Sequence, residues 1–159
     1  MADFLSAFFT YWDCGDLEAQ PGTKKIFYRK IGARKYQFRK VDYKARTALF
    51  FEALTLGRDI GSLFELLKTV PEDADDDQLL VAVLPAIIEM LTAPGVQTVL
   101  QNLCNTVAVD MGRGSFESLT EEHVAEEVFG ADLTLQAPVA ATAALINFDT
   151  LLSLVNTTK

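Results

Sequence analysis

The basic residues of this chain are concentrated in one short stretch, which constrains where that stretch can lie in a fold. Ten of the fourteen Lys and Arg residues fall within residues 24–46, where Asp42 is the one acid, so this stretch carries a charge of +9. The remaining residues hold 4 basic and 21 acidic side chains, a charge of −17, which brings the whole chain to −8. The pattern predicts a compact cationic surface on a strongly anionic body. It indicates a protein that attracts a partner, or copies of itself, rather than one that performs chemistry.

The basic stretch has the pattern of a β-hairpin over residues 24–41. Residues 26–30 and 36–41 are rich in β-branched and aromatic side chains, and a glycine lies between them. In the second strand Tyr36 and Phe38 alternate with polar residues, as expected of a strand with one buried face. A two-stranded ribbon is marginal by itself, so the hairpin needs a helix beneath it or another strand at its edge.

The basic side chains of the hairpin have two main interpretations. Lysine and arginine at a sheet edge guard it against unwanted pairing. Alternatively they contact an acidic partner surface, including the acidic body of a neighbouring copy. Nucleic acid is the least favoured partner, because the field of the whole chain repels phosphate. The candidate partner-binding residues in the hairpin are Arg34, Lys35, Arg39 and Lys40.

From Asp42 onward the apolar spacing is helical. Asp42 is a good N-cap, and Gly57 and Gly130 are suitable helix ends. The predicted fold is therefore mainly α, a bundle of about five to six helices with a short N-terminal β-hairpin. We divide the chain into an aromatic-rich segment, residues 1–23, and a single helical domain, residues 24–159, that opens with the basic hairpin. The predicted helices cover residues 42–56, 60–70, 77–91, 94–107, 118–129 and 131–155.

Apolar aromatic residues crowd the N-terminal segment. Their spacing fits one face of a short helix, but so short a helix is not stable alone and must dock. It docks either on the core of its own chain or on another subunit or partner. With further aromatic residues in the predicted helices, the candidate apolar contacts to a partner are Phe4, Phe8, Phe9, Trp12, Phe50, Phe51 and Phe64.

The residue inventory argues against catalysis and against a metal or cofactor site. The single histidine, His123, lies in a run of glutamates, which is typical of a solvated helix face. The acidic loop at residues 71–77 lacks the glycine and glutamate spacing of a calcium loop. Cys14 and Cys104 are far apart, without metal-ligand spacing, and no export signal precedes them, so we expect two free thiols in a reducing compartment. The longest apolar windows are interrupted by proline, so we expect no membrane span.

The order of features along the chain resembles that of a known family. A basic strand at residues 35–41 (KYQFRKV) leads directly into a helix at residues 45–56, and an acidic loop and apolar helices follow. An aromatic–glycine step at residues 129–133 (FGADL) precedes the last helix, which carries an Asn-Phe pair at residues 145–148 (LINF). This order is similar to that of the tail assembly chaperones of long-tailed bacteriophages, which are small, mostly α-helical proteins.

The resemblance implies a function. Such chaperones are not enzymes; they coat the long, aggregation-prone tape measure protein and keep it soluble until tail tube subunits polymerise around it. By this resemblance the partners are the tape measure protein, further copies of the chain and, as an additional candidate, the tail tube protein. It also implies action in the host cytoplasm and absence from the mature virion.

Two other functions remain compatible with the sequence. One is a structural tail or baseplate accessory protein that stays in the virion, which purified particles would reveal. The other is an acidic helical adaptor that neutralises one folded basic partner.

Overall fold

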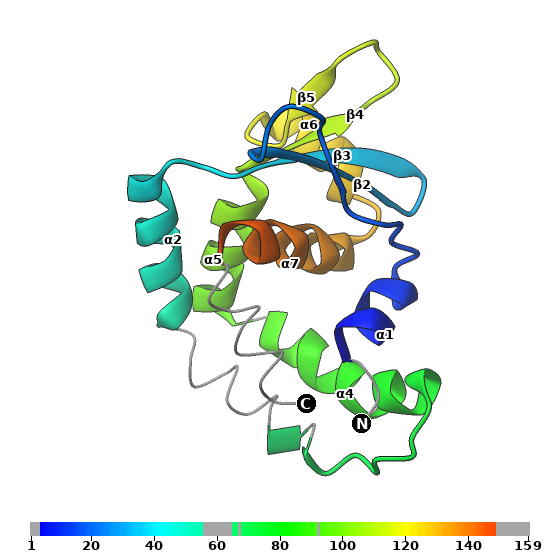
Figure 1. Ribbon diagram of the computed structural model, residues 1–159. Coiled ribbons are helices and arrows are strands. Elements are labelled where there is room, and N and C mark those ends of the chain that lie inside the picture. The colour runs from blue at the N-terminus through cyan, green and yellow to red at the C-terminus, as the bar shows by residue number, and fades with distance from the viewer. Residues whose placement is uncertain (1–3, 56–64, 67, 92, 149–159) are drawn as a thin grey trace.

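A five-stranded antiparallel sheet lies over a layer of helices in the computed structural model, which describes residues 4–55, 65–66, 68–91 and 93–148 (Figure 1). The prediction of a mainly α fold with a short hairpin is therefore wrong, because the described residues form an α+β fold. In chain order the elements are α1 Phe4–Tyr11, β1 Glu18–Ala19, β2 Ile26–Ile31, β3 Arg34–Arg39, α2 Tyr43–Leu54, α4 Asp76–Leu91, α5 Pro94–Cys104, β4 Val107–Asp110, β5 Phe116–Ser118, α6 Glu122–Phe129, the 3-10 turn Leu133–Leu135 and α7 Gln136–Asn147.

The sheet has the order β1-β2-β3-β4-β5, so strands far apart in the sequence are neighbours. The basic hairpin pairs β2 with β3, from Ile26 opposite Arg39 to Ile31 opposite Arg34. Its two-residue turn has Gly32 at φ 61°, a left-handed conformation that glycine adopts without strain. Strand β1 covers the free edge of β2, and β4 covers the free edge of β3.

The second hairpin, β4 with β5, is where the sequence-based prediction failed. Val107 and Val109 are buried on one face while Ala108 lies on the other, but such a short apolar run cannot be distinguished from the end of a helix by its spacing. This segment forms a strand because it pairs with β3, with Val107 opposite Phe38 and Val109 opposite Tyr36.

The core lies between the inner face of the sheet and the helices beneath it. Helix α7 lies against β3 and α5, and α1 packs on α4 at the other end of the helical layer (Figure 1). The largest side chains of the inner sheet face are almost completely buried, and they are Ile31, Tyr36, Phe38, Val107 and Val109. Sheet and helices therefore bury one shared core, to which α1 also contributes.

Several predicted helix ends are confirmed and others are corrected. Asp42 caps α2, since its Oδ1 accepts a hydrogen bond of 2.8 Å from the backbone N–H of Ala45. Helix α6 ends at Gly130 as expected, but it begins at Glu122 because Ser118 belongs to β5. The last predicted helix is divided into the 3-10 turn and α7. Most of the helix predicted at residues 60–70, and the end of the one predicted at 131–155, lie outside the described residues.

A buried asparagine connects the last helix to the segment between β3 and α2. The Asn147 side-chain oxygen accepts a hydrogen bond of 2.9 Å from the backbone N–H of Val41. Its amide nitrogen donates to the carbonyl oxygens of Arg39, at 3.4 Å, and Ala143, at 2.9 Å. Because the residue is buried, these bonds replace water and hold the segment that leads into α2 against the end of α7.

Candidate interaction surfaces

The N-terminal aromatic residues lie inside the protein. Phe8, Phe9 and Trp12 are all less than a tenth exposed, and the rings of Phe8 and Trp12 are 4.7 Å apart. The structure therefore places these three candidate contacts in the core of their own chain, the first of the two alternatives considered. The side chain of Phe4, and all of Phe64, lie outside the described residues.

The aromatic candidates on α2 have a different environment. Phe50 is half-buried, and its ring meets that of Phe148 edge-on, with 5.7 Å between the centroids. Phe51 is 62 % exposed, and Tyr43 at the start of the same helix is 77 % exposed. None of the twelve residues of α2 is fully buried. Sequence reasoning did not select Tyr43, although its spacing of two helical turns from Phe51 indicated a shared face.

The basic candidates are divided between the two faces of the sheet. Alternation along β3 directs Lys35 and Arg39 to the outer face, away from the buried Tyr36 and Phe38. Arg34 lies at the start of the strand, and its guanidinium is 3.4 Å from the sulfur of Met111 in the next hairpin. Lys40 follows the strand, and its backbone N–H donates to the carbonyl of Lys25.

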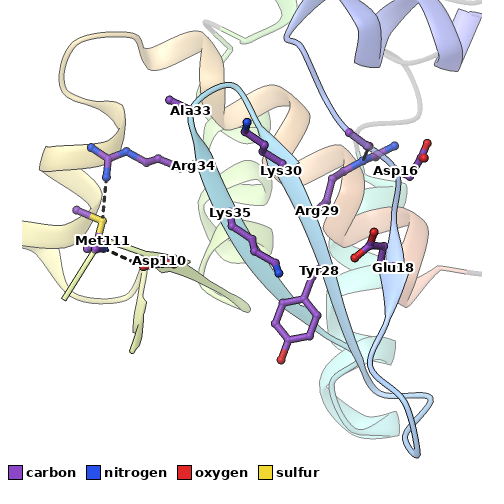
Figure 2. A pocket seen from close by; sticks show the side chains of 12 residues that line it. Asp16, Glu18, Tyr28, Arg29, Lys30, Ala33, Arg34, Lys35, Asp110 and Met111 are labelled. Atoms are coloured by element: carbon purple, nitrogen blue, oxygen red, sulfur yellow. Dashed lines mark hydrogen bonds between the residues drawn. The ribbon is translucent and has the colours of Figure 1, made fainter. Parts of the chain in front are cut away.

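The outer sheet face holds a cavity of about 800 Å³ that collects charged side chains from four segments (Figure 2). Lys30 and Lys35 stand directly opposite each other on β2 and β3, an arrangement of like charges that is unfavourable by itself. Neither forms an ion pair with a described residue, and the Lys35 ammonium lies 5.0 Å from the centroid of the Tyr28 ring. Glu18 and Asp110 flank the lysines, so the surface has mixed charge and suits a partner with both signs of charge.

The outer face is curved as well as charged. The ring centroids of Tyr28 in β2 and Phe116 in β5 are 5.5 Å apart, although β3 and β4 lie between these two strands. Neighbouring strands are about 4.8 Å apart, so this contact requires the sheet to curl towards its outer face. The two rings pack on each other and are half-buried, so they do not offer the free stacking surfaces that single-stranded nucleic acid uses.

Arg29 is a structural cation that sequence reasoning missed. Its guanidinium lies 4.0 Å from the centroid of the Phe9 ring and donates hydrogen bonds to the Gly15 carbonyl, at 2.8 Å, and the Thr142 hydroxyl, at 3.1 Å. Burial lowers the pKa of Arg29 from its ordinary value. This residue connects the sheet to both α1 and α7, so it is not available to a partner in the way Lys30 and Lys35 are.

An acidic surface, opposite in charge to the lysines of the sheet, lies on α6. Glu121, Glu122 and Glu126 are exposed, and His123 is exposed among them, as the sequence predicted. In the described part of the chain no three His, Cys, Asp or Glu side chains converge as a metal site would require.

No single described helix has the length and apolar composition to cross a membrane. A pair of helices bent by 109°, Glu122–Phe129 with Leu133–Asn147, meets that test by length and composition.

The two cysteines are free thiols, and both resist ionisation. Burial raises the pKa of Cys14 to about 11 and that of Cys104 to about 12. Burial also raises the pKa of the Tyr36 hydroxyl to about 12.

These raised pKa values predict a loss of stability at alkaline pH. Unfolded thiols and phenols ionise at their ordinary pKa values of 9.0 and 10.0, whereas the folded chain retains the protons. The unfolded state then binds fewer protons, so the free energy of unfolding falls as pH rises above about 9. Thermal unfolding under reducing conditions at pH 8 to 11 measures this. Tyr36→Phe should reduce the slope, whereas Tyr43→Phe, at an exposed position, should not; equal slopes for both variants would contradict the assignment.

Comparison with protein-family models, curated proteins and solved structures finds no match to this chain.

Proposed function

We propose that this protein is a non-enzymatic phage tail assembly chaperone, which binds the tape measure protein and keeps it soluble during tail assembly. The observation that carries the proposal is the contact between segments that are far apart in sequence and that together carry the family resemblance. Asn147 bonds to the backbone of Val41 and Arg39, and Phe148 packs on Phe50. The basic strand, the helix after it and the terminal Asn-Phe pair thus form one spatial unit. The proposal depends on this unit rather than on a mostly helical fold.

The surface chemistry supports a holding function. Such a chaperone needs an apolar surface for an unfolded or helical client and enough net charge to keep the complex in solution. Exposed Tyr43 and Phe51 on α2 are suited to the first requirement. The net charge of −8 and the exposed glutamates of α6 are suited to the second.

Self-association is part of the proposal. Lys30 and Lys35 on the outer sheet face, which form no ion pair with a described residue, and the exposed glutamates of α6 are complementary groups on one chain. A contact between different surfaces of identical copies produces rings or filaments. Such an array would place several copies along an extended client. We also propose action in the host cytoplasm, with the tail tube protein as a further candidate partner.

Co-expression with the tape measure protein of the same viral genome tests the proposal. The expected result is a soluble complex with several copies of this chain per client, measured by affinity pull-down and light scattering, where the client alone precipitates. Absence of binding, together with recovery of this chain in purified virions, would contradict it and favour a structural tail protein. Recovery with one folded basic protein instead would favour the adaptor function.

A further inference from the structure

The surface between α2 and the end of α7 forms a groove that carries features of a binding site. The groove has a volume of about 350 Å³, and the T-shaped pair of Phe50 and Phe148 lies at its base. Asn147 bonds the end of α7 to the segment that leads into α2, and Phe148 packs on Phe50, so the two walls hold their relative positions. A preformed groove requires less ordering when a partner binds.

A mainly apolar stripe of α2 lines this groove and continues to Leu54. Tyr43, Thr47, Phe51 and Leu54 follow one another at intervals of four, four and three residues, which places them on one side of a helix. Tyr43, Phe51 and Leu54 are each more than half exposed. A second helix with apolar residues at the same spacing can lie alongside such a stripe, which is how amphipathic helices dock into grooves.

Arg46 indicates the charge of the missing partner. It lines the groove as a half-buried residue, and its Nε atom has no hydrogen-bond acceptor among the described residues. A buried donor without an acceptor is unfavourable, and a carboxylate is the acceptor that arginine binds most strongly. Asp42 and Lys44, both exposed at this end of α2, offset each other and do not line the groove, so Arg46 is the charged group among its described lining residues. Tyrosine, phenylalanine and arginine are also the residue types enriched where binding energy is concentrated.

We propose that the groove between α2 and α7 binds an amphipathic helical segment of the client, with apolar residues on the α2 stripe and a carboxylate on Arg46. This inference rests on the proposed chaperone function and specifies the site at which the client binds. It assigns the client contact to Tyr43, Arg46, Phe51 and Leu54, and not to the buried aromatic residues of α1.

Two surface variants with the same change of charge test the site. Phe51→Asp in the full chain, co-expressed with the tape measure protein, should reduce the client recovered per copy by about tenfold or more, as expected for a central aromatic contact. Val81→Asp is the control, since Val81 is 76 % exposed on α4, away from the groove. It should recover as much client as the wild type. Both variants should keep the wild-type circular dichroism spectrum and melting temperature.

Arg46→Leu separates binding from folding. It removes the buried donor without an acceptor, so the melting temperature should stay the same or rise, while client recovery falls about tenfold. A fall in both would assign Arg46 to the fold alone and contradict its role in binding.

The outcomes distinguish the site from the function. If the wild type binds the client and Phe51→Asp binds it equally well, the groove proposal is wrong and the chaperone proposal stands. If the wild type does not bind, both are wrong. If Phe51→Asp converts a wild-type dimer into a monomer without changing client recovery, a second copy of this chain occupies the groove, and the proposal is again wrong.

Discussion

Deleting residues 1–23 is expected to unfold the protein rather than release a stable domain of residues 24–159. The deletion removes three core aromatic side chains, Phe8, Phe9 and Trp12, and also the strand that covers the edge of β2. Loss of a single buried aromatic side chain costs about 3–5 kcal/mol, whereas a whole domain is stable by about 5–15 kcal/mol. The combined loss therefore exceeds what a domain of this size can absorb. Circular dichroism and solubility of the truncated chain measure the result.

A pair of neighbouring point variants provides the control for this deletion. Phe9→Ala should reduce the free energy of unfolding by about 3–5 kcal/mol, because it leaves a cavity and removes the ring beneath the Arg29 guanidinium. Thr10→Ala, one position further along α1 and exposed, should change it by less than about 0.5 kcal/mol. A truncated chain that remains a folded monomer but no longer binds client would instead make residues 1–23 an appended binding segment.

Replacing Asn147 by leucine is expected to destabilise the protein by about 2–4 kcal/mol, because leucine has a similar size but makes no hydrogen bond. The substitution leaves the backbone N–H of Val41 and the carbonyl of Arg39 without this partner. It should also loosen α2, since Asn147 joins the entry of that helix to α7. Urea unfolding measures the first effect, and faster hydrogen exchange of the α2 amides measures the second.

Asn105→Leu is the matched control for this prediction. Asn105 is exposed at the end of α5, so the same substitution there should change the free energy of unfolding by less than about 0.5 kcal/mol. If Asn147→Leu and Asn105→Leu behave alike, the Asn147 hydrogen bonds do not hold α2 in place.

The basic hairpin and the start of α2 could be predicted because their determinants are local. Alternation of Tyr36 and Phe38, a glycine in the turn and an aspartate before an apolar helical run each act within a few residues. The second hairpin could not be predicted in this way. Val107 and Val109 form a strand only because β3 presents Phe38 and Tyr36 opposite them, about seventy residues earlier in the chain.

The candidate site was predictable in composition but not in position. The sequence indicated that Lys35 and Arg39 are surface cations and that the aromatic residues contact something. It did not distinguish Phe51, which is exposed, from Phe9, which is buried, because both lie in short apolar runs of a helix. It gave no reason to select Arg46, which lines a groove only because Asn147 and Phe148 at the end of α7 lie beside α2.

The sequence alone determined the separation of charge, the basic hairpin and the positions where several helices begin or end, because these depend on composition and on interactions between residues a few positions apart. The tertiary structure alone decided that the hairpin belongs to a five-stranded sheet, that the N-terminal aromatic residues enter the core and that α2 keeps an exposed apolar side. The physical reason is that burial is a property of pairs of surfaces. Whether an apolar side chain is covered depends on which distant segment packs against it. The spacing of apolar residues within one segment does not identify that distant segment.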